Sequence, residues 1–358
     1  MKILIIALSG IGDAIMFTPA LQLLKKQYPQ AEIDMLSMFR GVSDIFERSE
    51  YLTQVFHWDF VKEGATRSLG FLRNLRKKEY DISINVFPAN RKEYNIISFI
   101  IGAQKRLGTD YLNLNKSSFP FLLTHRTKEE DQLHNVEENC LLVELAGVKI
   151  PKDIPPLQID SMPEFEISAQ TWFAKNLPNS EHHTIIGIHA GSAIFKNQIN
   201  KRWDWKKYAE LGILLRKEYN AKILIFGGPE ERELNEQIVE ASKQTATLVT
   251  VPSLLASIAL MKRCHLFVSN DSGLMHIAAA LQLPLVAIFG YTSHVHTRPW
   301  KVKHEVVRHD LECSPCFYFS PRPASCKFQG EDEFKCIRRI EVSEVLAACR
   351  RMLQVDKN

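Results

Sequence analysis

KILIIALSGIGDAIMFTPALQLLKKQYP, residues 2–29, decides the fold. Residues 2–8 form an apolar run typical of a buried strand, and SGIGD at 9–13 is a glycine loop. Ile15, Leu21, Leu24 and Tyr28 then recur at helical spacing. The order strand, glycine loop, helix predicts the first unit of a parallel α/β sheet.

Two separate stretches repeat this alternation of strands and helices. The first runs to about residue 102, and the second runs from TIIGIHA at 184–190 to LPLVAIFG at 283–290. Between them, residues 147–165 carry four prolines, which oppose helices and central strands. We therefore expect an α/β protein with two Rossmann-like, doubly wound domains facing a central cleft. The expected parts are an N-terminal domain at 1–150, a linker at 151–165, a C-terminal domain at 166–340 and a closing helix within 341–358.

Composition and charge narrow the classes of function. The 358 residues are 45% hydrophobic and 24% charged, as in ordinary globular proteins. Residues 40–126 hold 14 Lys or Arg against 9 Asp or Glu, which fits a solvated surface, an anionic acceptor or an anionic membrane surface. Nucleic acid is not expected, because basic runs interleaved with aromatics are missing from the sequence. Polar residues interrupt the first apolar run too early for a signal peptide, so we expect a cytoplasmic protein.

The first glycine loop carries a candidate catalytic residue, Asp13. Gly10 and Gly12 resemble a dinucleotide fingerprint, but its third glycine position is Ile15, which disfavours a nicotinamide enzyme. The glycines allow a tight turn that places Asp13 at a helix start facing the cleft. The alternative is that Asp13 only caps the helix.

Another strand-to-helix junction predicts an anion site. In VSNDSGLMHIAAAL, 268–281, Asp271, Ser272 and Gly273 stand where the helix begins. Free amides at a helix start and a hydroxyl suit a diphosphate, whereas Asp271 suits sugar hydroxyls. N-capping by Asp271 or Ser272 is the alternative. His276 either reaches the phosphates or only packs against neighbouring side chains.

Two further loops complete the predicted donor site. IHAGS at 188–192 ends with Gly191 and Ser192, small residues that permit close approach, and Lys201 follows after a polar excursion. A lysine here would neutralise a diphosphate leaving group, and Lys196 is a rival for that role. In IFGGPEERE at 225–233, an acidic residue suits a ribose diol or complements a helix dipole.

Taken in order, SGIGDAIMFTPAL, HAGS, KRW, FGGPEE and NDSGLMHIAAAL resemble glycosyltransferase family nine, the ADP-heptose:lipopolysaccharide heptosyltransferases. The resemblance runs through nearly the whole chain. It implies a GT-B fold, with the acceptor mostly on the first lobe, the nucleotide sugar mostly on the second, and no catalytic metal. It also implies inverting transfer of a sugar, most simply heptose from ADP-heptose, onto a lipopolysaccharide-core or related glycolipid acceptor. A peripheral contact with the cytoplasmic face of the inner membrane is compatible with it.

The resemblance also implies roles for single residues. Asp13 would be the general base, and Lys201 and Ser192 would meet the diphosphate. Glu231 would take the ribose, and Asp271, Ser272 and Gly273 would hold sugar and phosphate.

The chain departs from the family pattern near the expected donor pocket. YTSHVH at 291–296 replaces the usual Pro-Thr-Asp or Ser-Pro, and the excursion between Ser192 and Lys201 is longer than expected. A different donor or a protein acceptor therefore stays open. So do another GT-B-like enzyme, such as a nucleotide-sugar epimerase, and a nucleotide-sugar-binding protein without catalysis.

Four cysteines crowd the end of the chain with the spacing C-x₂-C-x₉-C-x₉-C: Cys313, Cys316, Cys326 and Cys336. Cytoplasmic thiols stay reduced, and four thiolates suit tetrahedral metal coordination. The expectation is a structural zinc or iron site that takes no part in catalysis. Free thiols are the next alternative, and disulfides the last.

Overall fold

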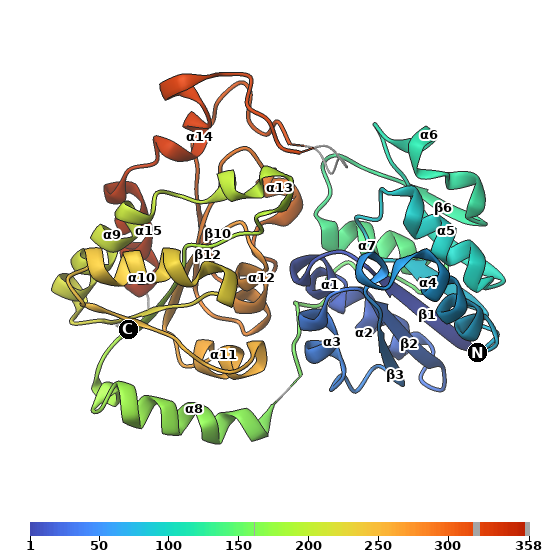
Figure 1. Cartoon of the computed structure of the whole chain (residues 1–358), viewed down its shortest axis with the longest axis horizontal. Helices are drawn as coiled ribbons and strands as arrows, with labels where there is room; N and C mark the ends of the chain where they lie inside the picture. Colours follow the sequence, from blue (N-terminus) through green and yellow to red (C-terminus); the bar gives the residue numbers. More distant parts are fainter. Residues whose placement is uncertain (161, 318–322, 355–358) are drawn as a thin grey trace. The chain divides into compact units, whose positions relative to one another are not determined.

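The computed structural model describes residues 1–160, 162–317 and 323–354. Its contacts divide the chain into two compact units. Unit 1 is Met1–Asp160, and unit 2 takes the described residues from Met162 onward (Figure 1).

Unit 1 is built on a parallel six-stranded sheet of order β3-β2-β1-β4-β5-β6. This is the doubly wound order, in which the chain winds outward from the centre twice. The strands are β1 Lys2–Ala7, β2 Glu32–Ser37, β3 Gln54–His57, β4 Ile82–Asn85, β5 Lys105–Asp110 and β6 His125–Lys128.

The central strand β1 explains why this unit needs helices on both faces of its sheet. Ile3 to Ile6 are completely buried, and side chains on a strand alternate between the two faces. Leu4 and Ile6 pack with residues of α4 and α5, including Leu72 and Ile97. The helices are α1 Ile11–Met16, α2 Thr18–Gln27, α3 Arg40–Phe46, α4 Phe60–Arg76, α5 Lys92–Ile101, α6 Asn115–Ser118 and α7 Asn135–Glu144.

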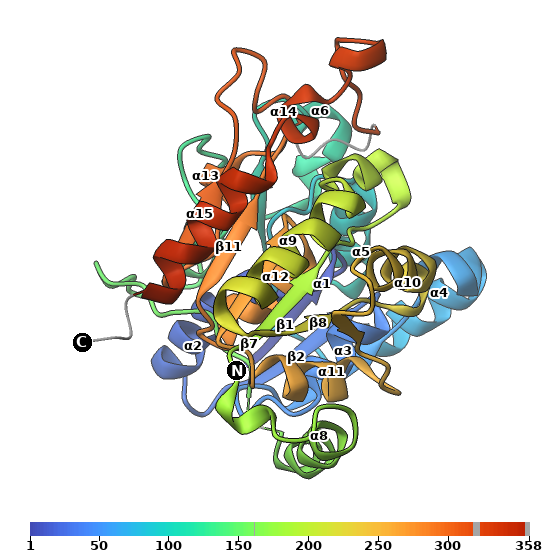
Figure 2. The ribbon, with the colours of Figure 1, turned by 90° about the vertical axis from the view of Figure 1, so that its left-hand side faces the viewer.

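Unit 2 repeats the same topology, with the order β12-β11-β10-β7-β8-β9 and all neighbours parallel. The strands are β7 Ile185–His189, β8 Lys222–Ile225, β9 Ala246–Leu248, β10 Leu266–Asn270, β11 Leu285–Ile288 and β12 His304–Val307. The helices are α8 Pro163–Asn176, α9 Trp205–Tyr219, α10 Arg232–Ala241, α11 Leu254–Met261, α12 Gly273–Ala280, α13 His294–Thr297, α14 Lys335–Arg338 and α15 Val342–Leu353. The last helix, α15, packs beside α9 (Figure 2).

Local differences from the expected elements have simple causes. The helix expected after the first glycine loop is split into α1 and α2, with Pro19 in the first turn of α2. Pro163 opens α8 at the position where a missing N–H costs nothing. Three polar strands, β5, β6 and β12, were not predicted, because KRLGTD, HRTK and HEVV lack apolar runs.

No helix in the described ranges is both long enough and apolar enough to span a bilayer.

Candidate functional site

The predicted donor residues gather at one edge of the sheet in unit 2. Strands β10, β7 and β8 are neighbours, and since they are parallel, their carboxyl ends meet at the same edge. His189, Ile225 and Asn270 are the last residues of these strands. In open α/β sheets, ligands bind beyond this edge.

The side chain of Asn270 forms hydrogen bonds with several segments at this edge. Its side-chain amide donates to the carbonyls of Ala190 at 2.8 Å and Gly191 at 3.2 Å. Its oxygen accepts from the backbone N–H of Trp203 at 3.0 Å and the hydroxyl of Tyr208 at 2.9 Å. All four contacts are buried, so the loop after β7 and the start of α9 are held in one position relative to β10.

Lys201 and Asp271 form a largely buried ion pair at the centre of the site. Lys201 Nζ donates to Asp271 Oδ2 at 2.8 Å, and the side chains are 15% and 7% exposed. Burial alone raises the pKa of Asp271, but Lys201 and the neighbouring His276 bring it below its ordinary value. Asp271 therefore stays ionised, and the lysine predicted to meet a diphosphate already has an acidic partner.

Glu231 is held at the start of α10 by several donors. Its Oε2 accepts from the backbone N–H of Gly228 at 3.0 Å and lies 3.1 Å from His189 Nε2. Arg202 stands 3.7 Å from its Oε1. Burial raises the pKa of Glu231, but these neighbours bring it below its ordinary value, so the carboxylate is charged. Gly191 lies beside it, and a Cβ at Gly191 would overlap the carboxylate and force it to move.

Ser192 connects this loop to the excursion that follows it. Its hydroxyl donates to the carbonyl of Gln198 at 2.9 Å, and Arg202 donates to the carbonyl of Ser192 at 2.7 Å. The short 3₁₀ segment Phe195–Lys201 thereby folds back over the loop. Lys196, the rival of Lys201, lies within this segment at a positive φ of 55°.

The predicted anion site lies at the N-terminus of α12. Ser272 is the N-cap and its hydroxyl accepts from the N–H of Met275 at 3.4 Å, while Gly273 is the first helical residue. His276 is buried on the first turn, and burial lowers its pKa to about 4. This histidine is therefore neutral near pH 7 and offers a hydrogen bond rather than a charge.

Three residues of this site were not predicted from the sequence: His189, Arg202 and Asn270. Each of them ends a strand or lies next to a predicted residue. That position along the chain was the feature of the sequence that could have marked them as site residues. His189 is 3% exposed, and its ring lies between Glu231 and Ser272, 3.0 Å from the Ser272 hydroxyl.

In unit 1, the first glycine loop places Asp13 in the first turn of α1. Its carboxylate accepts from the N–H of Gly10 at 3.2 Å, so part of its role is capping. Gly12 lies in the same turn. Nearby, Ser9 bonds to the hydroxyl of Tyr94 at 2.8 Å, and burial together with the charge of Asp13 raises the pKa of Tyr94 to about 12. Asp13 is half-buried.

The four C-terminal cysteines line one pocket of about 270 Å³. Cys326 Sγ accepts from the N–H of Phe334 at 3.3 Å. Burial, and to a lesser extent the other three thiols, raises the pKa of Cys336 to about 11. Over the described part of the chain, no three His, Cys, Asp or Glu side chains stand close enough together to hold a metal ion.

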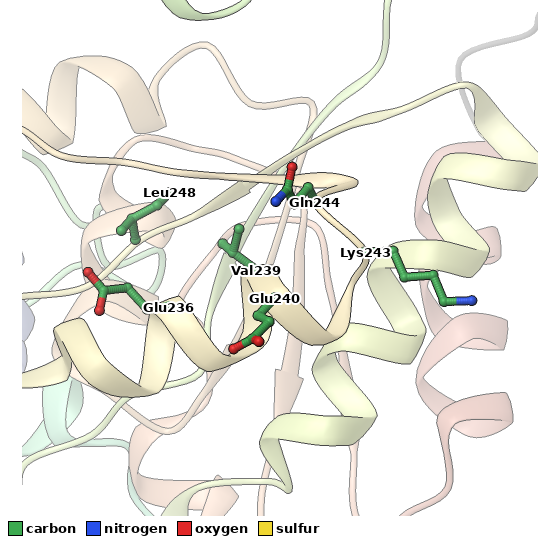
Figure 3. A pocket seen from close by; sticks show the side chains of 6 residues that line it. All are labelled: Glu236, Val239, Glu240, Lys243, Gln244 and Leu248. Carbon is green, nitrogen blue, oxygen red and sulfur yellow. The ribbon is translucent and has the colours of Figure 1, made fainter.

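A separate pocket of about 510 Å³ lies between α10 and β9, lined by Glu236, Val239, Glu240, Lys243, Gln244 and Leu248 (Figure 3). None of the predicted site residues lines it, and its lining comes from α10 beyond the first turn, from the turn after α10 and from β9. It is therefore distinct from the candidate donor site.

Comparison with known proteins points to one family. A family model described as glycosyltransferase family 9 (heptosyltransferase) matches residues 68–322. Lipopolysaccharide heptosyltransferase 2 of Salmonella typhimurium is 30% identical, over 86% of this chain and 88% of that protein. Lipooligosaccharide heptosyltransferase 2 of Campylobacter jejuni is 25% identical, over 99% of both chains.

Solved structures show the same fold. The glycosyl transferase family 9 protein of Veillonella parvula has a TM-score of 0.78 at 22% identity and covers 98% of this chain and 97% of its own. The ADP-heptose lps heptosyltransferase II of E. coli has a TM-score of 0.76 at 24% identity and covers all of both chains.

Proposed function

This chain belongs to glycosyltransferase family 9, and on that premise we propose that it transfers heptose from ADP-heptose onto a lipopolysaccharide-core acceptor. The observation that carries the proposal is the convergence of Glu231, Lys201 and the start of α12 at one edge of the sheet in unit 2. The relatives named lipopolysaccharide heptosyltransferase 2 and lipooligosaccharide heptosyltransferase 2 support the choice of sugar and acceptor.

The donor would lie across that edge in unit 2. Glu231 would accept hydrogen bonds from the ribose. Ser192, Lys201 and the amides after Ser272 would receive the diphosphate, whose negative charge a lysine and a helix start both stabilise. Asp271 and Gly273 would meet the sugar and the adjoining phosphate, with His276 as a neutral donor.

Catalysis would follow an inverting displacement without a metal ion. Asp13, from unit 1, would remove the proton of the acceptor hydroxyl as that oxygen attacks the anomeric carbon and the C–O bond to the diphosphate breaks. The electron pair of that bond leaves with ADP, where Lys201 and the start of α12 offset the charge.

Unit 1 would provide the acceptor domain of a cytoplasmic enzyme that touches the membrane peripherally. Phe121 is 74% exposed and Phe99 50% exposed. Arg106 lies near both of these aromatic residues. Its guanidinium is 5.6 Å from the centre of the Phe99 ring, and its Nε donates to the carbonyl of Leu122, the residue after Phe121, at 2.8 Å. Exposed aromatics beside cations suit an anionic lipid surface.

The cysteine pocket would hold one structural zinc or iron ion. The four thiols line a single pocket, and the N–H bond to Cys326 Sγ is of the kind that stabilises a thiolate. Binding would require the four thiols to move closer together. The ion would tie that segment together, and four thiolates would leave no position for substrate.

A transfer assay tests the proposed function. Purified protein is mixed with ADP-heptose and with lipopolysaccharide from a heptose-deficient strain, and mass spectrometry follows the acceptor. Addition of one heptose with release of ADP supports the proposal, and the configuration at the new bond tests inversion. Transfer only from another nucleotide sugar, or conversion of the donor without an acceptor, would contradict it. EDTA should leave the rate unchanged.

A further inference from the structure

His189 joins the two parts of the candidate donor site that would bind ribose and phosphate. It is the last residue of β7, the strand between β8 and β10. Its Nε2 lies 3.1 Å from Glu231 Oε2, and its Nδ1 lies 3.0 Å from Ser272 Oγ. One buried ring therefore spans from the carboxylate after β8 to the N-cap of α12.

The contacts fix how this ring is protonated on its Glu231 side. A charged carboxylate only accepts hydrogen bonds, so Nε2 carries a hydrogen and donates it. Nδ1 lies 3.0 Å from the Ser272 hydroxyl, a group that can donate to a ring nitrogen or accept from one. The hydroxyl oxygen still accepts from the N–H of Met275. The ring thus orients both the carboxylate and the capping serine.

The two carboxylate oxygens of Glu231 differ in their hydrogen bonds and in their surroundings. Oε2 already accepts from His189 and from the N–H of Gly228 at 3.0 Å. Oε1 faces the loop at Gly191, and Arg202 stands 3.7 Å away from it. A ligand hydroxyl would therefore be accepted by Oε1, while Oε2 anchors the side chain.

We propose that His189 is a positioning residue, which holds Glu231 so that Oε1 accepts a hydroxyl of the donor's ribose. This inference rests on the proposed function, since it takes Glu231 as the ribose-binding carboxylate. His189 touches no ligand itself. Its effect is selectivity for the ribose diol of a nucleoside diphosphate over a deoxyribose.

Two substitutions separate positioning from packing. In His189→Gln, the terminal amide nitrogen reaches the place of Nε2 and still donates to Glu231. In His189→Asn, the shorter amide reaches only the place of Nδ1, so Glu231 loses that donor. His265→Asn changes a histidine that precedes β10 at the other end of the sheet and serves as the matched control.

The experiment measures dissociation constants of ADP, 2′-deoxyADP and 3′-deoxyADP by calorimetry for the full-length protein and its variants. A hydrogen bond to a charged group contributes about 1.5–3 kcal/mol, so the wild type should prefer ADP over the more affected deoxy analogue by about 10-fold or more. His189→Gln and His265→Asn should keep this preference. His189→Asn should reduce it to about 3-fold or less, with nearly unchanged affinity for that analogue.

Three results would overturn the inference. If His189→Asn keeps the wild-type preference while Glu231→Gln loses it, Glu231 binds ribose and His189 does not position it. If His189→Asn and His189→Gln weaken all three ligands by the same factor, the histidine only packs. If the wild type does not distinguish the three nucleotides, the ribose role of Glu231 in the proposed function falls as well. Thermal melting of each variant establishes that it is folded.

Discussion

A Cβ atom on Gly191 would overlap the carboxylate of Glu231, so any other residue at this position of the loop after β7 would displace that carboxylate. Gly228, on the other side of the same carboxylate, has open space where a Cβ would stand. The two glycines therefore form a matched pair for testing the donor site.

Gly191→Ala should weaken ADP binding by about 10-fold or more, because Glu231 must move away from its donors and loses its contact with the ligand. Gly228→Ala should leave the affinity within about 2-fold, since its backbone N–H still reaches Glu231. Calorimetric titration with ADP measures both. Equal effects of the two substitutions would show that Glu231 does not contact the nucleotide.

Lys201→Met should lower the free energy of unfolding by about 3–5 kcal/mol, because Asp271 is left as a buried charge without its partner. Adding Asp271→Asn should restore most of that stability but not the ADP affinity, since the cation that meets the diphosphate is still missing. Denaturant unfolding and ADP titration measure the two effects. If Lys196→Ala lowers ADP affinity and the double variant does not, Lys196 is the diphosphate lysine.

Asp13→Asn should reduce kcat by about 100-fold or more, because the general base is lost. The Asn oxygen can still accept from the N–H of Gly10, so the turn and the affinity for donor should be preserved. ADP release in the presence of acceptor gives kcat, and ADP titration gives the affinity. Turnover close to that of the wild type would remove Asp13 from the mechanism.

Buried His276 predicts a loss of stability in mild acid. Its folded-state pKa of about 4 lies below the ordinary value of 6.5, so between these pH values the unfolded chain binds more protons than the folded one. The free energy of unfolding should fall by about 2 kcal/mol from pH 7.5 to pH 5 through this group. Urea unfolding at the two pH values measures it, and His276→Gln should flatten the dependence. An unchanged slope in that variant would contradict the prediction.

The sequence predicted the central part of the fold because the central strands are continuous apolar runs. KILIIA, IIGIH and LFVSN are almost wholly buried, and the expected two doubly wound domains of a GT-B-type fold are confirmed by the two sheets and the solved relatives. The edge strands β6 and β12 are polar and partly exposed, so their composition resembles that of loops. The resemblance to family nine is confirmed by the family match.

The site could be predicted only as a set of positions along the chain. Asp271, Ser272 and Gly273 were found because a strand ends and a helix begins there. The pairing of Lys201 with Asp271, 70 residues apart, depends on how β7 and β10 lie side by side. The contacts of His189 with Glu231 and Ser272 depend on the same packing, so its place at a strand end marks the position but does not predict these contacts. The catalytic and binding roles themselves stay predictions.

The last prediction concerns the pocket lined by Cys313, Cys316, Cys326 and Cys336. Protein purified anaerobically without added metal should contain about one equivalent of zinc or iron by elemental analysis, because four thiolates bind such an ion tightly. Cys313→Ser should lower the metal content and the melting temperature together, while Cys264→Ser, at a buried cysteine of unit 2 that does not line this pocket, should leave the metal content unchanged. ADP affinity should persist in Cys313→Ser if the ion is only structural. Less than about a tenth of an equivalent of any transition metal, with four thiols titrating freely in the native protein, would show that the pocket holds free cysteines.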